Sequence, residues 1–137
     1  MPILIPEIKD LAAIEKHSYA EFEILNEIKK LDPNKTKDWV IYYSFFFKGS
    51  NRNNSYVNNE IDFLILIPNG GIFTFEIKGG YIKNGSFGLQ SIDRNGVPHD
   101  IDPYNQSKNN FYGLENALKE QHPFGIGSNG LKLSNFK

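Results

Sequence analysis

Apolar residues recur at helical spacing in two segments of the chain, and the first segment runs from Ser18 to Leu31. Ser18 is a residue type that caps helix N-termini, and Glu21 three residues later completes a capping-box pattern. The segment is therefore predicted to be an amphipathic helix that ends at Asp32-Pro33-Asn34. Its apolar face carries Phe22, Leu25, Ile28 and Leu31.

The second helical segment runs from Pro103 to Glu120. Asp102 is placed to cap its N-terminus, and Pro103 suits the first helical position because its missing N–H would be unpaired there anyway. Apolar residues form one stripe along it: Phe111, Leu114 and Leu118. We expect this stripe to pack against a sheet.

Between the helices, β-branched and aromatic residues predict strands. The run from Trp39 to Phe47, WVIYYSFFF, is typical of a mostly buried strand, and we interpret it as core rather than as a platform for stacked bases. The polar segment from Lys48 to Asn59 is predicted to be a surface loop. Ile61 to Ile67 and Ile72 to Lys78 then form a predicted hairpin.

A second, more polar hairpin is predicted from Tyr81 to Asp93, with turns at Asn84-Gly85 and Asn95-Gly96. After the second helix, Leu131 to Phe136 is expected to form a last short strand at most. The predicted order is α-β-β-β-(hairpin)-α-(β). This order describes an α/β fold, in the sense of a small mixed sheet flanked by helices.

Composition favours one folded domain over residues 1–137, because this length supports a hydrophobic core but not two ordinary domains. Cysteine is absent, which excludes disulfides and cysteine-ligated zinc and leaves oxygen or histidine ligands for any metal. His17, His99 and His122 lack metal-ligand spacing and are interpreted as surface or loop residues. The net charge is −1, whereas a domain that grips DNA by phosphates alone is usually basic.

The N-terminal sequence MPILIPEIKD has too short an apolar run for a signal peptide, and no window has the roughly 18 apolar residues of a membrane span. We therefore expect a cytoplasmic protein with no membrane partner.

The first hairpin carries charge where a sheet core should be apolar. Asp62 opens one strand, and Glu76 and Lys78 close the other. With a two-residue turn, Asp62 would pair with Ile77 and face away from Glu76. With a three-residue loop of Asn69-Gly70-Gly71, Asp62 would lie opposite Lys78 and diagonal to Glu76. Only the odd register brings the charges onto one face.

On one face, these groups suit a hard divalent cation. Asp62, Glu76 and the carbonyl of Ile77 could hold Mg²⁺ and leave positions for water and a phosphate oxygen. A bound metal makes its water more acidic, and Lys78 could position that water or offset phosphoryl charge. The alternative is an exposed Glu-x-Lys ion pair, worth under about 1 kcal/mol, beside an ordinary turn aspartate.

Four segments, in this order, resemble motifs of the nuclease-related domain (NERD) family within the PD-(D/E)xK nuclease superfamily, and the resemblance runs through most of the chain. They are Ser18-Tyr19-Ala20-Glu21, Glu60-Ile61-Asp62-Phe63, Phe75 to Gly80, and Asp102 to Gln106 followed by Phe111 to Leu114. Ala20 departs from the family's usual glycine.

The resemblance implies a restriction-endonuclease-like αβββαβ core, with the last strand short or missing here, and assigns catalysis to Asp62, Glu76 and Lys78. It implies that Glu21 is a further metal or water ligand and that Gln106 orients substrate or water. Two alternatives stay open: Glu21 completes the capping box and turns away, and Gln106 is an ordinary first-turn polar residue.

We therefore expect a deoxyribonuclease that depends on Mg²⁺ or Mn²⁺. The rival interpretation is a catalytically weak module that binds nucleic acid or protein and regulates a partner such as a helicase. A structural subunit of a repair or antiviral defence complex is a more distant alternative. The resemblance also leaves open that the chain is a fragment of a larger helicase-containing protein. DNA is favoured over RNA, while endonuclease and exonuclease action both stay open.

Overall fold

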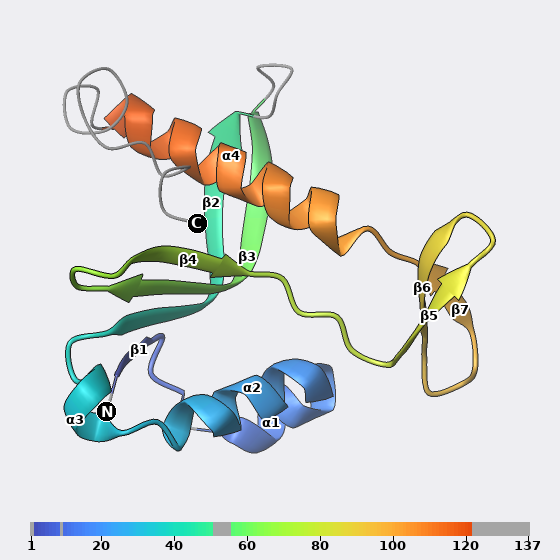
Figure 1. The fold of residues 1–137 in the computed structure, drawn as a ribbon, viewed down its shortest axis with the longest axis horizontal. Coiled ribbons are helices and arrows are strands. Elements are labelled where there is room, and N and C mark those ends of the chain that lie inside the picture. Colours follow the sequence, from blue (N-terminus) through green and yellow to red (C-terminus); the bar gives the residue numbers. More distant parts are fainter. Residues whose placement is uncertain (1, 9, 51–55, 122–137) are drawn as a thin grey trace.

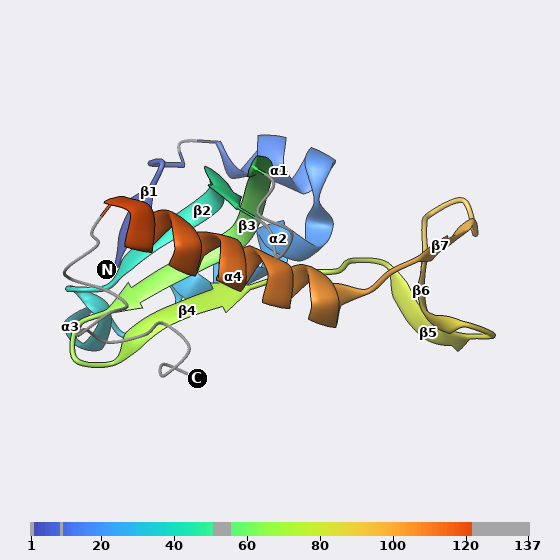
Figure 2. The same ribbon diagram turned by 90° about the horizontal axis from the view of Figure 1, so that it is seen from above.

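The computed structural model describes residues 2–8, 10–50 and 56–121, and Figures 1 and 2 show its arrangement. Its elements in chain order are β1 (Ile3–Ile5), α1 (Leu11–His17), α2 (Tyr19–Lys29), α3 (Pro33–Thr36), β2 (Val40–Ser50), β3 (Tyr56–Ile67), β4 (Gly71–Phe75), β5 (Tyr81–Gly85), β6 (Gly88–Ile92), β7 (Pro98–Asp100) and α4 (Pro103–Gln121).

The main sheet has four strands in the order β1-β2-β3-β4, with β1 parallel to β2 and the other neighbours antiparallel. Helices α1 and α2 cover one face and α4 covers the other (Figure 1). The fold is thus the predicted mixed sheet flanked by helices. None of the described helices is long and apolar enough to cross a membrane.

The two helices predicted from apolar periodicity are confirmed as α2 and α4. The Oγ of Ser18 accepts a hydrogen bond from the N–H of Glu21 at 3.4 Å, which caps α2. Asp102 caps α4 by accepting from the N–H of Asn105 at 3.2 Å. Each cap satisfies a main-chain donor that the first helical turn leaves unpaired.

Two apolar clusters hold the layers together. Leu25 and Ile28 of α2 pack with Ile41 and Phe63 on one face of the sheet. On the other face, Leu114 of α4 packs with two β3 residues, Ile61 and Leu64. Because the sheet is apolar on both faces, it needs both helical layers to exclude water.

Strands β2 and β3 bend sharply at Ser44 and Asp62. Phe63 packs under α2 but Ile61 packs under α4, although residues two apart on a regular strand share a face. The paired positions run from Tyr43↔Phe63 directly to Phe45↔Ile61, and Ser44 between them has a left-handed φ of 53°. On one side of the bend, β3 pairs with β4. On the other side, both strands run toward α4 (Figure 1).

Several predicted boundaries were wrong. The predicted loop from Lys48 to Asn59 is largely strand, because β2 continues to Ser50 and β3 begins at Tyr56. Strand β4 ends at Phe75, so Glu76 and Lys78 follow the strand instead of closing it. The elements β1, α1 and α3 were not predicted, and the predicted strand from Leu131 to Phe136 lies outside the described residues.

The second predicted hairpin is a separate antiparallel sheet in the order β5-β6-β7. Its first turn lies at Ser86-Phe87, not at Asn84-Gly85, since Gly85 pairs with Gly88. The predicted turn at Asn95-Gly96 is confirmed, with Gly96 at φ 77°. This small sheet projects beyond the main layers (Figures 1 and 2).

The bend at Ser44 gives a test that separates backbone strain from hydrogen bonding. Ser44→Val and Ser44→Gly both delete the bond from the Ser44 hydroxyl to Glu60 Oε1, which is 2.7 Å long. Only valine resists a left-handed φ, because it is β-branched. We expect Ser44→Val to be less stable than Ser44→Gly by about 1–3 kcal/mol in chemical denaturation. Equal stability of the two variants would contradict a left-handed φ at Ser44.

Candidate active site

The site forms where the β3–β4 ladder ends. The last paired positions near it are Phe63↔Phe75 and Leu64↔Thr74, so the same register continued by one step places Asp62 opposite Glu76. Beyond Phe75 the chain leaves the ladder, and the N–H of Ile77 donates instead to Asp62 Oδ2 at 2.7 Å. A side-chain acceptor thus replaces the main-chain partner at the end of the hairpin.

The register is odd, as the active-site hypothesis required, but the loop is not the one predicted. Ile67 pairs with Gly71, so the three loop residues are Pro68-Asn69-Gly70, and Asn69 adopts the left-handed conformation at φ 59°. The alignment is shifted relative to the prediction. Continued by one step beyond Phe63↔Phe75, this register sets Asp62 opposite Glu76, so the position opposite Lys78 considered for the Asn69-Gly70-Gly71 loop was wrong.

Glu76 and Lys78 form an ion pair with 2.8 Å between Lys78 Nζ and Glu76 Oε1. The Glu76 side chain is 5% exposed and that of Lys78 is 27% exposed. The pair is therefore not an exposed surface pair. A carboxylate this deeply buried needs its partner, because an unpaired charge in the interior is costly.

Glu21 enters the site from the first turn of α2. Its Oε2 accepts a hydrogen bond from the hydroxyl of Tyr43 on β2, at 2.7 Å. The N–H of Ser18, which a capping box would direct to this carboxylate, donates to Ile14 O instead. Ser18 still caps the helix, but Glu21 turns toward the sheet. The capping box is therefore not closed by Glu21, while its role as a metal or water ligand stays a prediction.

The acids influence one another electrostatically. Burial, as the largest cause, together with the carboxylates of Glu76 and Glu21, raises the pKa of Asp62 from 3.8 to about 6, against lowering by the Ile77 N–H and by Lys78. Burial and the bond to Glu21 likewise raise the pKa of Tyr43, which also experiences Asp62. Elements distant in sequence thus concentrate negative charge at the end of the hairpin.

The described part of the chain contains no group of three carboxylate or histidine side chains close enough together to hold a metal ion as they stand. Each acid is engaged by a donor of the protein: Asp62 by the Ile77 N–H, Glu76 by Lys78, and Glu21 by Tyr43. The carboxylates of Glu76 and Glu21 thus act electrostatically on Asp62, but each of the three carboxylates has a donor of the protein as its hydrogen-bond partner.

Gln106 is not brought to these residues by any described contact. Its side chain is exposed on α4, and no hydrogen bond or ion pair within the described ranges joins it to Asp62, Glu76 or Lys78. The histidines agree with the surface interpretation where the structure describes them. His17 is exposed and His99 pairs with Asp93 at 2.9 Å, while His122 lies outside the described residues.

Sequence reasoning missed the residues that support the acids. Tyr43 was assigned to the core, yet its hydroxyl holds Glu21. Glu60 accepts from the Ser44 hydroxyl through Oε1, and its main-chain carbonyl accepts from Asn110 Nδ2 of α4 at 2.8 Å. The sequence signal for these contacts was Ser44, which interrupts the aromatic run YYSFFF with a small hydroxyl residue.

Gly79 and Gly80 let the chain pass closely between α2 and the small sheet. A Cβ on Gly79 would lie 3.2 Å from the Cβ of Ala20 on α2. A Cβ on Gly80, whose φ is +84°, would lie 2.6 Å from the carbonyl oxygen of Ile92. Gly80 is therefore required by space and by backbone conformation, whereas a side chain at Gly79 would need Ala20 to shift by a few tenths of an ångström.

A mixed sheet between helices, with Asp62, Glu76 and Lys78 gathered where its hairpin ends, is consistent with an α/β nuclease-like core. The model of the nuclease-related domain (NERD) family matches residues 16–129. The chain therefore belongs to this family. Comparison with curated proteins and comparison with solved structures gave no match.

The raised pKa of Asp62 predicts the effect of Asp62→Asn on stability. Between pH 3.8 and about 6 the folded protein binds more protons than the unfolded chain, so ionisation of Asp62 destabilises the fold as pH rises. Asparagine can still accept the Ile77 N–H but carries no charge. We expect Asp62→Asn to raise stability at pH 7.5 by on the order of 1 kcal/mol in metal-free buffer, and much less at pH 4.5.

Thermal melts at the two pH values measure this difference, and Asp93→Asn is the control. The pKa of Asp93 is lowered, mainly by His99, so its replacement should give no gain at pH 7.5. An Asp62→Asn protein that gains as much at pH 4.5 as at pH 7.5 would show that burial of the Asp62 charge is not the cause.

Proposed function

We propose that this protein is a metal-dependent nuclease that hydrolyses phosphodiester bonds of DNA with Mg²⁺ or Mn²⁺. The observation that carries the proposal is that Glu76, Glu21 and Lys78 all act electrostatically on the partly buried Asp62 at the end of the β3–β4 hairpin. Membership in the nuclease-related domain family supports it.

The donor set fits a hard divalent cation in its chemistry. Magnesium and manganese prefer oxygen ligands, and the candidates are the carboxylates of Asp62, Glu76 and Glu21 with the carbonyl of Ile77. The raised pKa of Asp62 reflects burial and carboxylate neighbours, which is the type of environment that a bound cation stabilises. Bound there, the ion would acidify water and offset negative charge on a phosphate.

The protein's own residues have separate tasks in this proposal. The Ile77 N–H fixes the direction of the Asp62 carboxylate, and the Tyr43 hydroxyl does the same for Glu21. Lys78 neutralises Glu76 in the absence of substrate and donates hydrogen bonds to the scissile phosphate when substrate is bound. This exchange supplies positive charge where the phosphoryl oxygens become more negative.

A second candidate is a catalytically weak module that binds nucleic acid or protein and regulates a partner such as a helicase. The engagement of all three carboxylates by protein donors favours it, since a metal must compete with Lys78 and Tyr43. The net charge of −1 also suits a protein whose grip on DNA is helped by a partner.

Glu76→Gln and Lys78→Gln test the enzymatic proposal. Glutamine keeps side-chain size and some hydrogen bonding but removes the charge that binds the cation or the phosphate. We expect each variant to lose metal-dependent DNA cleavage by at least about 100-fold. The assay follows a labelled DNA substrate with Mn²⁺, with Mg²⁺ and with chelator.

Glu27→Gln and Lys30→Gln provide matched controls, because these residues form an exposed ion pair on α2 with 2.6 Å between Lys30 Nζ and Glu27 Oε1. They should cleave like the original protein. Absence of cleavage by the original protein with either metal, on single-stranded and duplex DNA, would sink the enzymatic proposal and favour the second candidate.

A further inference from the structure

The small sheet β5-β6-β7 presents its large side chains to solvent. None of residues 81–100 is buried, and Tyr81 on β5 is 71% exposed. Phe87, at the tip of the β5–β6 turn, is fully exposed at 103%. A fully exposed phenylalanine adds nothing to packing among the residues that the structure describes, and exposed aromatic surface marks a contact site.

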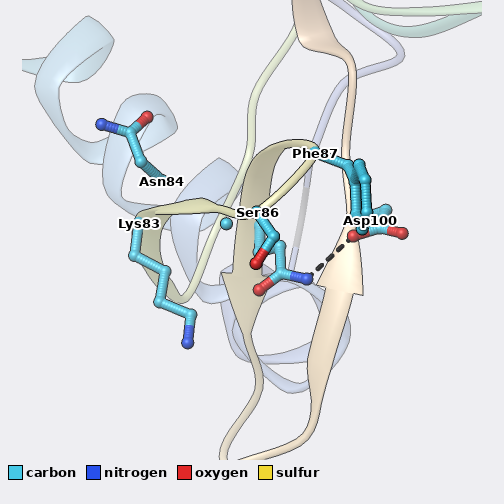
Figure 3. A pocket seen from close by; sticks show the side chains of 7 residues that line it. Lys83, Asn84, Ser86, Phe87 and Asp100 are labelled. Atoms are coloured by element: carbon cyan, nitrogen blue, oxygen red, sulfur yellow. Dashed lines mark hydrogen bonds between the residues drawn. The ribbon is translucent and has the colours of Figure 1, made fainter.

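Phe87 stands between two hollows. One, of about 590 Å³, lies over the sheet and is lined by polar groups that include Lys83, Gln90 and Asp100 (Figure 3). The other, of about 440 Å³, lies between the turn and the start of α4, where Tyr104 is 74% exposed. The exposed rings of Phe87 and Tyr104 thus both line this second hollow, which borders the small sheet.

The polar residues beside Phe87 lie in a row across the three strands. In the strand register, Lys83 lies opposite Gln90, and Gln90 lies opposite Asp100. Gln90 Nε2 donates to Asp100 Oδ1 at 2.9 Å (Figure 3), and a carboxylate can accept further hydrogen bonds. Donors and acceptors beside an aromatic ring are what recognition of a nucleobase edge requires.

The charge of this region excludes a grip based mainly on phosphates. Residues 81–108 contain three cations and three carboxylates, which cancel: Lys83, Arg94 and Lys108 against Asp93, Asp100 and Asp102. Lys108 Nζ lies 5.9 Å from the centre of the Tyr104 ring. Aromatic stacking is therefore the main attraction available here for a nucleic acid.

The sheet is fixed to the candidate active site. The hydroxyl of Ser91 on β6 donates to the carbonyl of Gly79 at 2.7 Å, and Gly80 passes against Ile92. Lys78 therefore lies directly beside a segment that the small sheet holds. The chain passes from Lys78 through Gly79 and Gly80 directly into β5, so the small sheet is the element that follows the candidate active site along the chain.

We infer that β5-β6-β7 and the start of α4 bind single-stranded DNA by stacking bases on Phe87 and Tyr104. The inference rests on the proposed nuclease function, because it places this strand on the way to Lys78. Duplex DNA would hide its base faces from these rings, so the site favours single strands.

The test measures binding of a fluorescent single-stranded thymidine 20-mer by anisotropy, with the full chain in chelator so that cleavage plays no part. We expect Phe87→Ala and Tyr104→Ala each to raise Kd by at least about five-fold, as for loss of one stacked base. Phe46→Ala on β2 is the matched control, because Phe46 is also exposed, at 68%, and it should leave Kd unchanged.

Salt dependence provides a second readout. If only Lys78, Lys83 and Lys108 contact phosphates, log K should fall against log salt concentration with a slope of about −2.1 or shallower. No binding of the 20-mer, equal Kd for all three variants, tighter binding of duplex, or a much steeper slope would each overturn the inference. Because the chelator prevents cleavage, the result of this binding test does not depend on whether the protein cleaves DNA in other assays.

Discussion

The hydrogen bond from the Ile77 N–H to Asp62 Oδ2 is the interaction on which the site depends. It closes the hairpin after the main-chain ladder has ended at Phe75, and it occurs at the bend where β2 and β3 change direction. This bond ties the segment with Glu76 and Lys78 to β3, and the packing of Ile77 against the cluster that contains Phe63 holds the same segment from its apolar side.

The packing around this hydrogen bond explains how a small domain accommodates several carboxylates close to its core. Helices α2 and α4 cover opposite faces of the sheet, and the acids lie where α2 and the end of the β3–β4 ladder meet. Each of the three acids accepts from a donor of the protein, which limits the cost of placing them together: Tyr43 on β2 for Glu21, and Ile77 and Lys78 of the segment after β4 for Asp62 and Glu76. The raised pKa of Asp62 is the remaining cost, and it is the feature that a cation would relieve.

What the sequence could predict was local. The caps at Ser18 and Asp102 act within one turn, so α2 and α4 were predicted correctly. The register of the hairpin was left open between a two-residue and a three-residue loop, because several positions near Gly70 can adopt turn conformations. The bend at Ser44 and the bond from Tyr43 to Glu21 arise from contacts between elements, which no short motif encodes.

The proposal that Asp62, Glu76 and Glu21 would hold one divalent cation is tested most sharply by calorimetric titration with Mn²⁺. At pH 7.5 the account predicts one saturable site in the original protein. It predicts at least about ten-fold weaker binding in Asp62→Asn, because a neutral amide replaces a carboxylate ligand. No saturable binding, or equal binding by Asp62→Asn, would contradict the account.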